Sequence, residues 1–325
     1  MSAHAAPAAV VPLVMRGVSK RFGATVALDD VSLEVRPGEL FGLVGPDGGG
    51  KTTLFRILTT LLVPDAGSAQ LLGRDVVRDL WDIRARVGYM PGRFSLYPDL
   101  SVEENLRFFA SVFGTTIEAG YSMIAPIYRQ IEPFRDRRAG ALSGGMKQKL
   151  ALSCALVHRP EILLLDEPTT GVDAVSRREF WDLLHALRAS GLPIVVATPY
   201  MDEANRCDRV ALMQKGRVLA VDAPTAIGAR FPRPLLAVRG GMQGRARSAL
   251  IETLRGYPHA ASVFPFGEVL HYSDTRHDAV PELLARELRG YLGAHGFPDA
   301  EVAPIRAGIE DAFMALMHTP PDVAA

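Results

Sequence analysis

A nine-residue stretch, Gly45–Thr53, limits what this chain of 325 residues can fold into more than any other stretch. Its letters, GPDGGGKTT, fit the phosphate-loop pattern G-x-x-x-x-G-K-[ST]. The apolar run 40–44 precedes it and predicts a buried strand, and apolar residues between 54 and 58 follow it with helical spacing. Strand, loop and helix in this order separate a true site from a chance match. We therefore predict a phosphate-binding loop.

The residues of this loop suit the chemistry of phosphate. Glycine has no Cβ, so backbone N–H groups can close around phosphate oxygens, and the positive end of the next helix points at them. We expect Lys51 to reach the β- and γ-phosphates and the Thr52 hydroxyl to hold Mg²⁺. The candidate phosphate-binding residues are Gly45, Pro46, Asp47, Gly48, Gly49, Gly50, Lys51, Thr52 and Thr53.

A second apolar run, residues 162–165, ends in two carboxylates, Asp166 and Glu167. A buried parallel strand would place Asp166 at its carboxyl end, where ligands bind in open α/β sheets. There Asp166 suits Mg²⁺, also through a water, and Glu167 suits a base for an attacking water.

The amino-terminal part of the chain predicts a strand and a helix start. Residues 13–23 read as an edge strand and a turn, in which Phe22 either stacks on a nucleotide base or lies in the core. Val31, Leu33 and Val35 alternate with polar residues, a half-buried strand pattern. Ser101 with a glutamate three residues later predicts a capping box at the start of a helix.

Two further helix starts are expected downstream. Ser143 is a good N-cap for a helix running to about His158, and the paired glycines after it leave N–H groups for an anion, although an ordinary cap would look the same. Thr198 and Pro199, after the buried strand 192–198, are expected to be the N-cap and first residue of another helix.

Composition excludes some classes of protein. The 36 basic and 36 acidic residues balance, so no basic excess argues for nucleic acid. Cys154 and Cys207 have neither metal-site nor disulfide spacing, which suits a reducing cytosol. The apolar runs are too short to span a bilayer. Residues 1–11 are rich in alanine and proline, lack the layout of a signal peptide, and read as a disordered lead-in.

The motifs together resemble those of the ATP-binding subunits of ABC transporters, over about residues 12–227. GPDGGGKTT matches Walker A, LSGGMKQKL the signature, ILLLDEP Walker B and TTGVDA the D-loop; GYMP, LYPDLSVEENL and LSGGMKQK resemble the drug-exporter branch. The resemblance implies an α/β fold of the P-loop NTPase type, with a parallel-sheet core, an antiparallel β subdomain and a helical signature subdomain at about 93–158.

The resemblance also implies roles. ATP and Mg²⁺ would be the cofactors, with Phe22 stacking on adenine, Thr52 and Asp166 at Mg²⁺, and Glu167 polarising water. In a sandwich dimer the signature would cover the partner subunit's ATP through Ser143, Gly144, Gly145 and Gln148. Asp173 would lie in the dimer seam, or be only a turn aspartate.

Partners and place in the cell follow from the same resemblance. Dimer closure would drive membrane-spanning permease subunits through a groove near residues 93–99. The chain would lie on the cytoplasmic side of the inner membrane, held there by the permease, as one half of a homodimer or heterodimer.

Two residues depart from the family pattern. Gly92 stands where the family usually has Gln, and Pro199, which has no N–H donor, where it usually has His. ATP binding should be little affected, and hydrolysis should be slow. Three interpretations stay open: the ATPase of an exporter, a hydrolysis-poor member of a heterodimer, and a non-transport ABC protein of translation or DNA repair. Proteins of the last kind usually carry two ATP modules or a long coiled-coil insertion, and neither is seen here.

The pattern changes near 229–234. We expect the ATP-binding domain to cover 12–230, and a small α+β accessory domain to cover 231–325. Short strands are predicted at 235–238, 261–264 and 269–272, and helices at 245–254 and 280–292. The histidines of this part are scattered and expected on the surface rather than as metal ligands; they are His259, His271, His277 and His295.

Overall fold

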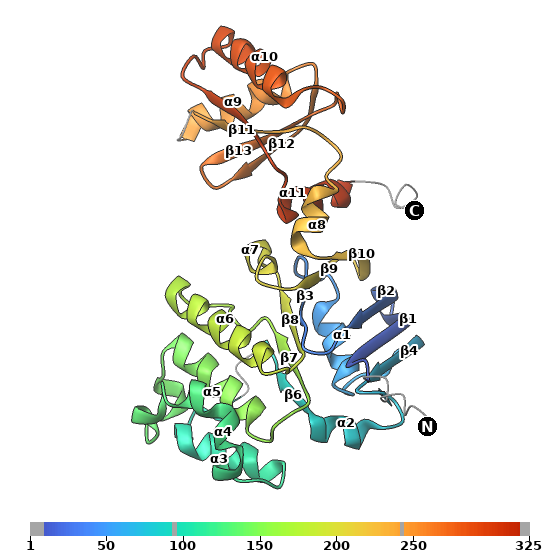
Figure 1. The fold of residues 1–325 in the computed structure, drawn as a ribbon, viewed down its shortest axis with the longest axis vertical. Helices are drawn as coiled ribbons and strands as arrows, with labels where there is room; N and C mark the ends of the chain where they lie inside the picture. The colour runs from blue at the N-terminus through green and yellow to red at the C-terminus, as the bar shows by residue number, and fades with distance from the viewer. Residues whose placement is uncertain (1–9, 93–95, 241–243, 319–325) are drawn as a thin grey trace, which may run out of the picture. The chain divides into compact units, whose positions relative to one another are not determined.

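The computed structural model describes residues 10–92, 96–240 and 244–318. The chain divides into two compact units, Met1–Pro224 and Thr225–Ala325 (Figure 1). The sequence placed this boundary after residue 230. The division falls after the first residue of helix α8 (Pro224–Ala229), and a Cβ on its Gly228 would stand 2.7 Å from the Ala307 carbonyl oxygen, so most of α8 belongs to the second unit. Most of the predicted disordered lead-in, residues 1–9, lies outside the described residues.

The first unit is built on a six-stranded sheet in the order β10-β9-β3-β8-β7-β6. Five of its strands run parallel, and β10 is antiparallel at one edge. Every residue of β3, β7 and β8 is buried, as expected for strands that are covered on both faces. The strands are β3 (Leu40–Val44), β6 (Val87–Met90), β7 (Ile162–Asp166), β8 (Ile194–Thr198), β9 (Arg209–Gln214) and β10 (Arg217–Asp222).

A second, antiparallel sheet of this unit has the order β2-β1-β4-β5. Its strands are β1 (Leu13–Phe22), β2 (Thr25–Val35), β4 (Ala66–Leu71) and β5 (Arg74–Asp75). The alternating burial of β2 is confirmed, but the prediction that β1 is an edge strand is wrong. β1 pairs with β2 on one side and with β4 on the other. Because β4 lies far from β1 in the sequence, the residues of β1 alone do not indicate this second pairing. Both sheets and helix α1 (Lys51–Leu58) share one hydrophobic cluster.

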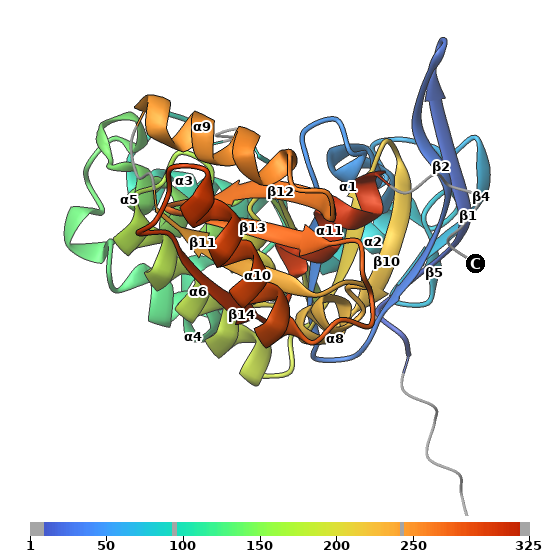
Figure 2. The same ribbon diagram turned by 90° about the horizontal axis from the view of Figure 1, so that it is seen from above.

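Helices fill the rest of the unit. They are α2 (Leu80–Arg86), α3 (Val102–Val112), α4 (Ile117–Tyr128), α5 (Gly144–Leu156), α6 (Ala174–Ala189) and α7 (Met201–Ala204), with 3₁₀ turns at Glu132–Phe134 and Ala139–Ala141. Figures 1 and 2 show α3, α4 and α5 gathered on the side of the unit away from β1, β2 and β4. The predicted capping box is confirmed: Ser101 Oγ accepts from the Glu104 N–H, and the Glu104 carboxylate accepts from the Ser101 N–H.

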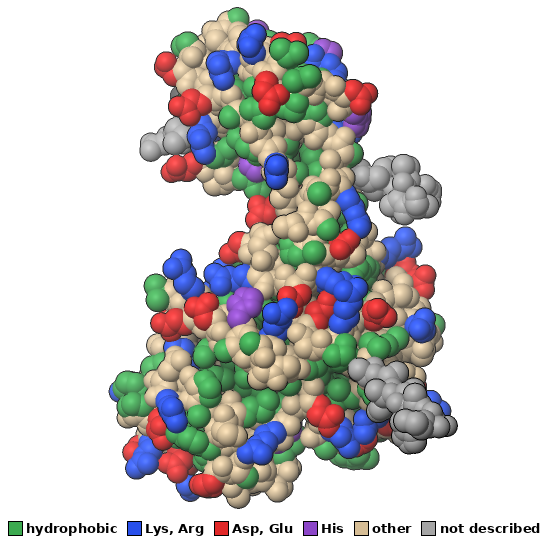
Figure 3. Space-filling model, in the orientation of Figure 1, with side chains coloured by type: hydrophobic (Ala, Val, Ile, Leu, Met, Phe, Trp, Pro, Cys, Tyr) green, Lys and Arg blue, Asp and Glu red, His purple; other side chains and the backbone are tan. Residues whose placement is uncertain are grey.

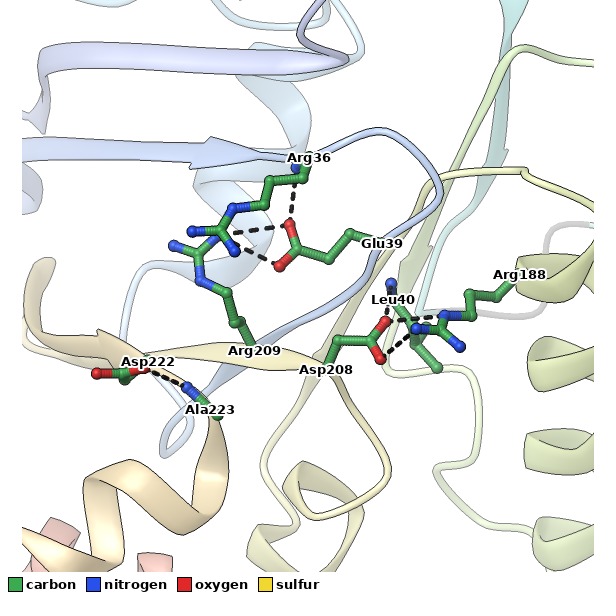
Figure 4. Close-up of polar contacts among 8 residues, drawn as sticks. All are labelled: Arg36, Glu39, Leu40, Arg188, Asp208, Arg209, Asp222 and Ala223. Atoms are coloured by element: carbon green, nitrogen blue, oxygen red, sulfur yellow. Dashed lines mark hydrogen bonds and ion pairs between the residues drawn. The ribbon is translucent and has the colours of Figure 1, made fainter.

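Ion pairs fasten the amino-terminal edge of the parallel sheet (Figure 4). The Asp208 carboxylate accepts from the Leu40 N–H at 2.9 Å and from the Arg188 guanidinium at 2.6 and 3.0 Å. Glu39, which is buried, accepts from Arg209 at 3.2 Å and from the Arg36 N–H at 2.7 Å. These contacts tie the starts of β3 and β9 to their surroundings and lie at the end of the sheet opposite to its carboxyl edge.

The second unit has the element order βαββαβ, followed by a helix. Its elements are β11 (Leu235–Arg239), α9 (Gly244–Arg255), β12 (Ala260–Phe266), β13 (Val269–Asp274), α10 (Pro281–Ala294), β14 (Glu301–Ile305) and α11 (Ile309–His318). The antiparallel sheet order β12-β13-β11-β14 is that of a ferredoxin-like fold. The expected small α+β domain is confirmed, while β14 and α11 were not predicted.

Helix α11 lies on the sheet face opposite to α9 and α10. Leu270 and Tyr272 of β13 join the cluster formed with those two helices, so His271 between them points to the other face. There its Nδ1 lies 2.7 Å from the Asp311 carboxylate of α11. His271 is thus half-buried and paired, which corrects the expectation of a surface residue. Among the described residues, no group of three or more His, Cys, Asp or Glu could hold a metal ion.

Candidate functional site

The carboxyl edge of the parallel sheet brings together segments that are far apart in the sequence. Val44 at the end of β3 pairs with Thr198 at the end of β8, and Ala197 of β8 pairs with Asp166 at the end of β7. The loop that begins at Gly45, the carboxylates and the segment after β8 therefore leave the sheet side by side.

The phosphate loop has the shape that its glycines allow. A Cβ on Gly45 would stand 2.1 Å from the Met213 carbonyl oxygen. Gly50 has a φ of +101°, and a Cβ there would stand 2.6 Å from the Ala27 carbonyl oxygen. Gly50 is the N-cap of α1, and no side chain caps this helix. The N–H groups of its first turn therefore face the loop, as they do where a helix start binds an anion.

Lys51 lies inside this loop. Its side chain is buried, and its Nζ donates to the carbonyl oxygens of Gly45 at 2.8 Å and Pro46 at 3.0 Å. The same Nζ is 3.7 Å from the Glu167 carboxylate. The ammonium group is thus held between the loop backbone and one of the two candidate carboxylates.

Thr52 and Asp166 lie next to each other. The Thr52 hydroxyl donates to Asp166 Oδ1 at 3.3 Å, and Asp166 is buried. Burial raises the pKa of Asp166, and the neighbouring Glu167 adds to this rise. A hydroxyl and a carboxylate are oxygen ligands that suit Mg²⁺, which typically binds one or two carboxylates together with substrate phosphates. The residues present therefore fit a magnesium–nucleotide complex.

Glu167 follows Asp166 in an uncommon backbone conformation. Its φ is +50°, in the left-handed region that non-glycine residues rarely adopt. The sheet fixes this turn, because the Glu167 N–H donates to the Ala197 carbonyl oxygen at 2.9 Å. Backbone strain of this kind is concentrated at functional sites.

The structure corrects the expected role of Pro199. Helix α7 begins at Met201 with Tyr200 as its N-cap, so Thr198 and Pro199 are not the cap and first residue. The reason is a local hydrogen bond: the Thr198 hydroxyl accepts from the Tyr200 N–H at 3.1 Å and turns the chain before the helix starts. Pro199 is half-buried at the strand end.

The second departure from the pattern, Gly92, lies beside the backbone of the segment that carries the two carboxylates. A Cβ on Gly92 would stand 3.1 Å from the Asp166 carbonyl oxygen and 3.7 Å from Glu167 Cβ. A side chain at this position would start directly beside the candidate magnesium site.

The signature segment lies elsewhere in the unit. Ser143 Oγ accepts from the Met146 N–H at 3.3 Å, which confirms the predicted cap, and Gly144 and Gly145 open α5. A Cβ on Gly145 would stand 2.5 Å from Ser176 Oγ of α6, so the segment packs on the start of that helix. Figures 1 and 2 both show α5 well apart from α1. One chain alone does not bring the signature to its own phosphate loop.

Three further predicted residues have defined places. Asp173 is the N-cap of α6 and accepts from the N–H groups of Val175 and Ser176. Gln148 lies half-buried on α5. Phe22, at the end of β1, is 47% exposed, so it does not lie in the core.

Sequence analysis missed a buried carboxylate close to the site. Glu203 of α7 accepts from the Thr169 hydroxyl at 2.6 Å and from the Thr198 hydroxyl at 2.5 Å. An acidic pair in the first turn of a helix, here Asp202 and Glu203, normally indicates exposed side chains that favour the helix dipole. Glu203 is recognised as a buried, hydrogen-bonded residue only when Thr169 and Thr198, from other parts of the chain, are placed beside it.

An apolar groove of about 640 Å³ lies on the first unit. Its lining includes Trp81, Leu96, Val112, Phe113 and His158. Trp81 is 76% and Val112 61% exposed, and the rings of Phe113 and His158 stack at 3.7 Å. Burial lowers the pKa of His158 to about 4, so it is neutral near pH 7. Of the groove expected near residues 93–99, residues 93–95 lie outside the described residues.

Comparisons with known proteins agree with this geometry. The ABC transporter family model matches residues 28–170. The Nod factor export ATP-binding protein I of Burkholderia thailandensis is 36% identical over 312 residues, which cover 94% of this chain and 97% of that protein.

The chain belongs to the ABC transporter ATP-binding family. A probable multidrug ABC transporter ATP-binding protein of Escherichia coli is 36% identical over 309 residues, which cover 94% of this chain but 52% of that protein. The chain thus spans about half the length of this relative.

A solved ABC cassette agrees in fold. It is a dimer in a post-hydrolysis state bound to ADP and Pi, with a TM-score of 0.59 and 26% identity, over 65% of this chain and 98% of that one. The predicted P-loop fold of the ABC ATPase type is confirmed. Among the residues that the structure describes, no helix is both long and apolar enough to cross a bilayer.

Proposed function

We propose that this chain binds and hydrolyses MgATP to drive membrane-spanning subunits of an exporter. One observation carries the proposal: Lys51, Thr52, Asp166 and Glu167 meet at the carboxyl edge of the parallel sheet. A cation, a hydroxyl and two carboxylates beside an uncapped helix start form the set that phosphoryl transfer to water needs.

Each residue then has a role in nucleotide binding. The loop Gly45–Thr53 would hold the phosphates with its backbone N–H groups and Lys51, and the exposed Phe22 ring would stack on adenine. Thr52 and Asp166 would hold Mg²⁺. When bound, the ion supplies positive charge that offsets the charge developing on the phosphates.

Glu167 would orient and deprotonate the attacking water. Its side chain is 24% exposed, so water can reach it, while its backbone is held by the hydrogen bond to Ala197. The hydroxyl of Thr170 lies 3.5 Å from its Oε2. A carboxylate that is fixed and yet accessible is what a general base requires.

A second ATP-binding subunit would complete each site. Because α5 lies well apart from α1, the segment Ser143, Gly144, Gly145 and Gln148 would serve the ATP of a partner subunit, with Asp173 in the seam. The solved cassette dimer is similar to the first unit in fold. The partner could be a second copy of this chain or a different ATP-binding subunit.

Permease subunits would dock in the apolar groove. A groove that leaves Trp81 and Val112 largely exposed is typical of a protein-binding surface. The names of the relatives, Nod factor export and multidrug transport, favour export. The chain would then lie on the cytoplasmic side of the inner membrane, held there by the permease. On the face shown in Figure 3, basic and acidic side chains are interspersed, with no extended basic patch for nucleic acid.

The direct test is to purify the chain together with its permease subunits and to measure phosphate release from MgATP. We expect turnover that is stimulated by the permease and abolished by Glu167→Gln. Turnover that is the same in Glu167→Gln would contradict the assignment. If the complex with the permease subunits still forms when Trp81→Glu and Val112→Glu are combined, docking in the apolar groove is contradicted.

A second function is favoured by Gly92 and Pro199. Gly92 lies beside the backbone of Asp166 and Glu167, Pro199 directly follows β8 at the carboxyl edge, and neither has a polar side chain to offer to phosphates or to Mg²⁺. The chain could therefore bind ATP, hydrolyse it poorly, and use Ser143–Gly145 to complete the site of a competent partner. In that case the isolated chain shows negligible turnover, and Ser143→Arg abolishes the turnover of the mixed dimer.

A further inference from the structure

The buried carboxylate of Glu203 joins two segments of the first unit. Its two oxygens accept separately, Oε1 from the Thr169 hydroxyl at 2.6 Å and Oε2 from the Thr198 hydroxyl at 2.5 Å. Glu203 is 1% exposed, so water does not compete for these hydrogen bonds. O–H···O distances in this range are typical of charge-assisted hydrogen bonds, which are about twice as strong as neutral ones.

The two threonines lie at or just beyond the ends of the neighbouring strands β7 and β8, both at the carboxyl edge of the parallel sheet. Thr169 lies in the loop that starts at Glu167 and ends at Asp173, the N-cap of α6. Thr198 is the last residue of β8 and precedes Pro199. Glu203 is therefore a side-chain bridge between the loop that carries the candidate base and the end of β8, where Thr198 pairs with Val44 just before the phosphate loop.

Helix α6 reaches the same carboxylate. Arg177 Nε lies 3.7 Å from Glu203 Oε1, and the Arg177 guanidinium lies 4.5 Å from the centre of the Tyr200 ring. The cation balances the buried negative charge, while Tyr200 follows Pro199 directly. The start of α6, the loop after Glu167 and the turn into α7 thus converge on one side chain.

Packing alone does not account for a carboxylate here. Taking a carboxylate out of water is unfavourable unless other groups replace its lost hydrogen bonds, and an apolar side chain of similar volume would fill the space without that cost. The carboxylate gains two directional contacts, each to a different segment, and these fix how the segments lie relative to each other.

We propose that Glu203 is a positioning residue that holds the loop after Glu167 and the strand end before Pro199 as one rigid unit. The consequence for hydrolysis rests on the proposed function: the Glu167 carboxylate and the segment beside the phosphates would keep a fixed geometry during turnover. The bridge itself does not depend on hydrolysis.

The test uses two isosteric variants of the whole chain, Thr169→Val and Thr198→Val, and their double variant. Each single change keeps the volume and removes one hydroxyl–carboxylate bond. Thr198→Val also removes the acceptor of the Tyr200 N–H, so its effect on the bridge is measured in the loop after Glu167 and not at Tyr200. Ser153→Ala is the matched control, because Ser153 is also buried and its hydroxyl donates to the Lys149 carbonyl oxygen at 2.8 Å within α5. Hydrogen exchange followed by mass spectrometry reads the amides of both segments without nucleotide.

Exchange should change across the bridge in both directions. Thr198→Val should raise exchange at the Thr170 and Val172 amides, and Thr169→Val should raise exchange at the Tyr200 amide, each roughly tenfold or more because a hydrogen bond to a charged group is lost. The double variant should add little, since either single change opens the bridge. The bridge would be overturned if a variant raised exchange only in the segment that carries its own substitution. It would also be overturned if Ser153→Ala raised exchange in these segments to the same extent.

A kinetic readout separates positioning from a merely structural role. Both valine variants should lower kcat for ATP hydrolysis about tenfold or more while KM and the affinity for an ATP analogue stay within twofold. Coupled exchange with unchanged kcat would overturn the positioning role. A wild-type chain without turnover would defeat the hydrolytic function instead, and the exchange data alone would then decide whether Glu203 joins the two segments.

Discussion

Replacing Gly92 with glutamine should raise ATP turnover, and alanine at the same position is its matched control. A Cβ on Gly92 would lie 3.1 Å from the Asp166 carbonyl oxygen and 3.7 Å from Glu167 Cβ. A glutamine side chain would therefore start beside the Asp166 backbone and the Glu167 Cβ, and we expect its amide oxygen to extend toward the candidate magnesium site. Alanine brings the same Cβ without the amide, so the difference between the two variants isolates the polar group.

The structure also sets the expected cost to stability. The neighbouring carbonyl must move by a few tenths of an ångström to admit the Cβ. Crowding of this kind costs about 1 kcal/mol, and the loss of glycine flexibility in the unfolded chain offsets part of it. For a unit of this size, about 1 kcal/mol shifts Tm by roughly 2–4 °C. Both variants should therefore fold, with similar small shifts in Tm.

Pro199→His is the companion change. Pro199 precedes α7 instead of starting it, so its replacement does not cost the helix its first residue. One positioned polar contact to developing charge is worth roughly a hundredfold in rate. We predict that Pro199→His and Gly92→Gln each raise kcat by roughly tenfold or more, that the double variant exceeds both, and that Gly92→Ala stays at the wild-type rate.

Steady-state phosphate release at saturating MgATP gives the comparison. A wild type that already turns over at about 1 per second or faster, with no gain in either variant, would refute the reasoning. It would mean that Lys51, Glu167 and the signature of the partner suffice. A gain in Gly92→Ala equal to that in Gly92→Gln would show that backbone stiffness, and not the amide, changes the rate.

Three further predictions use single substitutions. Lys51→Ala should remove most of the affinity for a fluorescent ATP analogue, and, because this buried side chain also bonds the Gly45 and Pro46 carbonyls, it should lower Tm by a few degrees; unchanged affinity would contradict its role. Glu167→Gln should keep ATP binding, abolish turnover and favour an ATP-dependent dimer in size-exclusion chromatography; a monomer with wild-type turnover counts against it. Asp274→Asn tests the second unit: burial opposes ionisation, but hydrogen bonds from Arg276 and Tyr272 hold the pKa of Asp274 below 3.8. Ionised Asp274 stabilises the folded state at pH values above its pKa in the unfolded chain. This stabilisation is lost as the pH falls through its lower pKa in the folded state. The variant should lose about 1–3 kcal/mol at pH 7, measured by hydrogen exchange of β13, and this loss should shrink as the pH falls through the folded-state pKa of Asp274.

Local pattern was enough for much of the fold. The glycine loop, the buried strands before it and before Asp166, the capping box at Ser101 and the cap at Ser143 each depend on residues that are neighbours in the chain. Their geometry is set by backbone sterics, by side-chain to backbone hydrogen bonds and by burial, all of which the sequence shows directly. The second unit was recognised as α+β for the same reason, although β14, a strand with only one buried residue, left too weak a pattern.

Other features depended on partners distant in the chain. β1 lies inside its sheet because β4 pairs with it, and the residues of β1 do not by themselves indicate that pairing. Pro199 stands outside α7 because the Thr198 hydroxyl caps the Tyr200 N–H, whereas sequence rules favoured proline as the first helical residue. Glu203 looks like a surface acid until Thr169 and Thr198 are placed beside it.

The sequence by itself determined which groups could do phosphate chemistry, because glycine, lysine, threonine and carboxylate at fixed spacing have those properties wherever the chain folds. The tertiary structure alone decided which of them meet and how they are held. Strand register places Thr198 beside Val44, and Asp166 beside Ala197. Register is set by burial and pairing across the whole sheet, so the distances between Lys51, Thr52, Asp166 and Glu167 exist only once the sheet has formed.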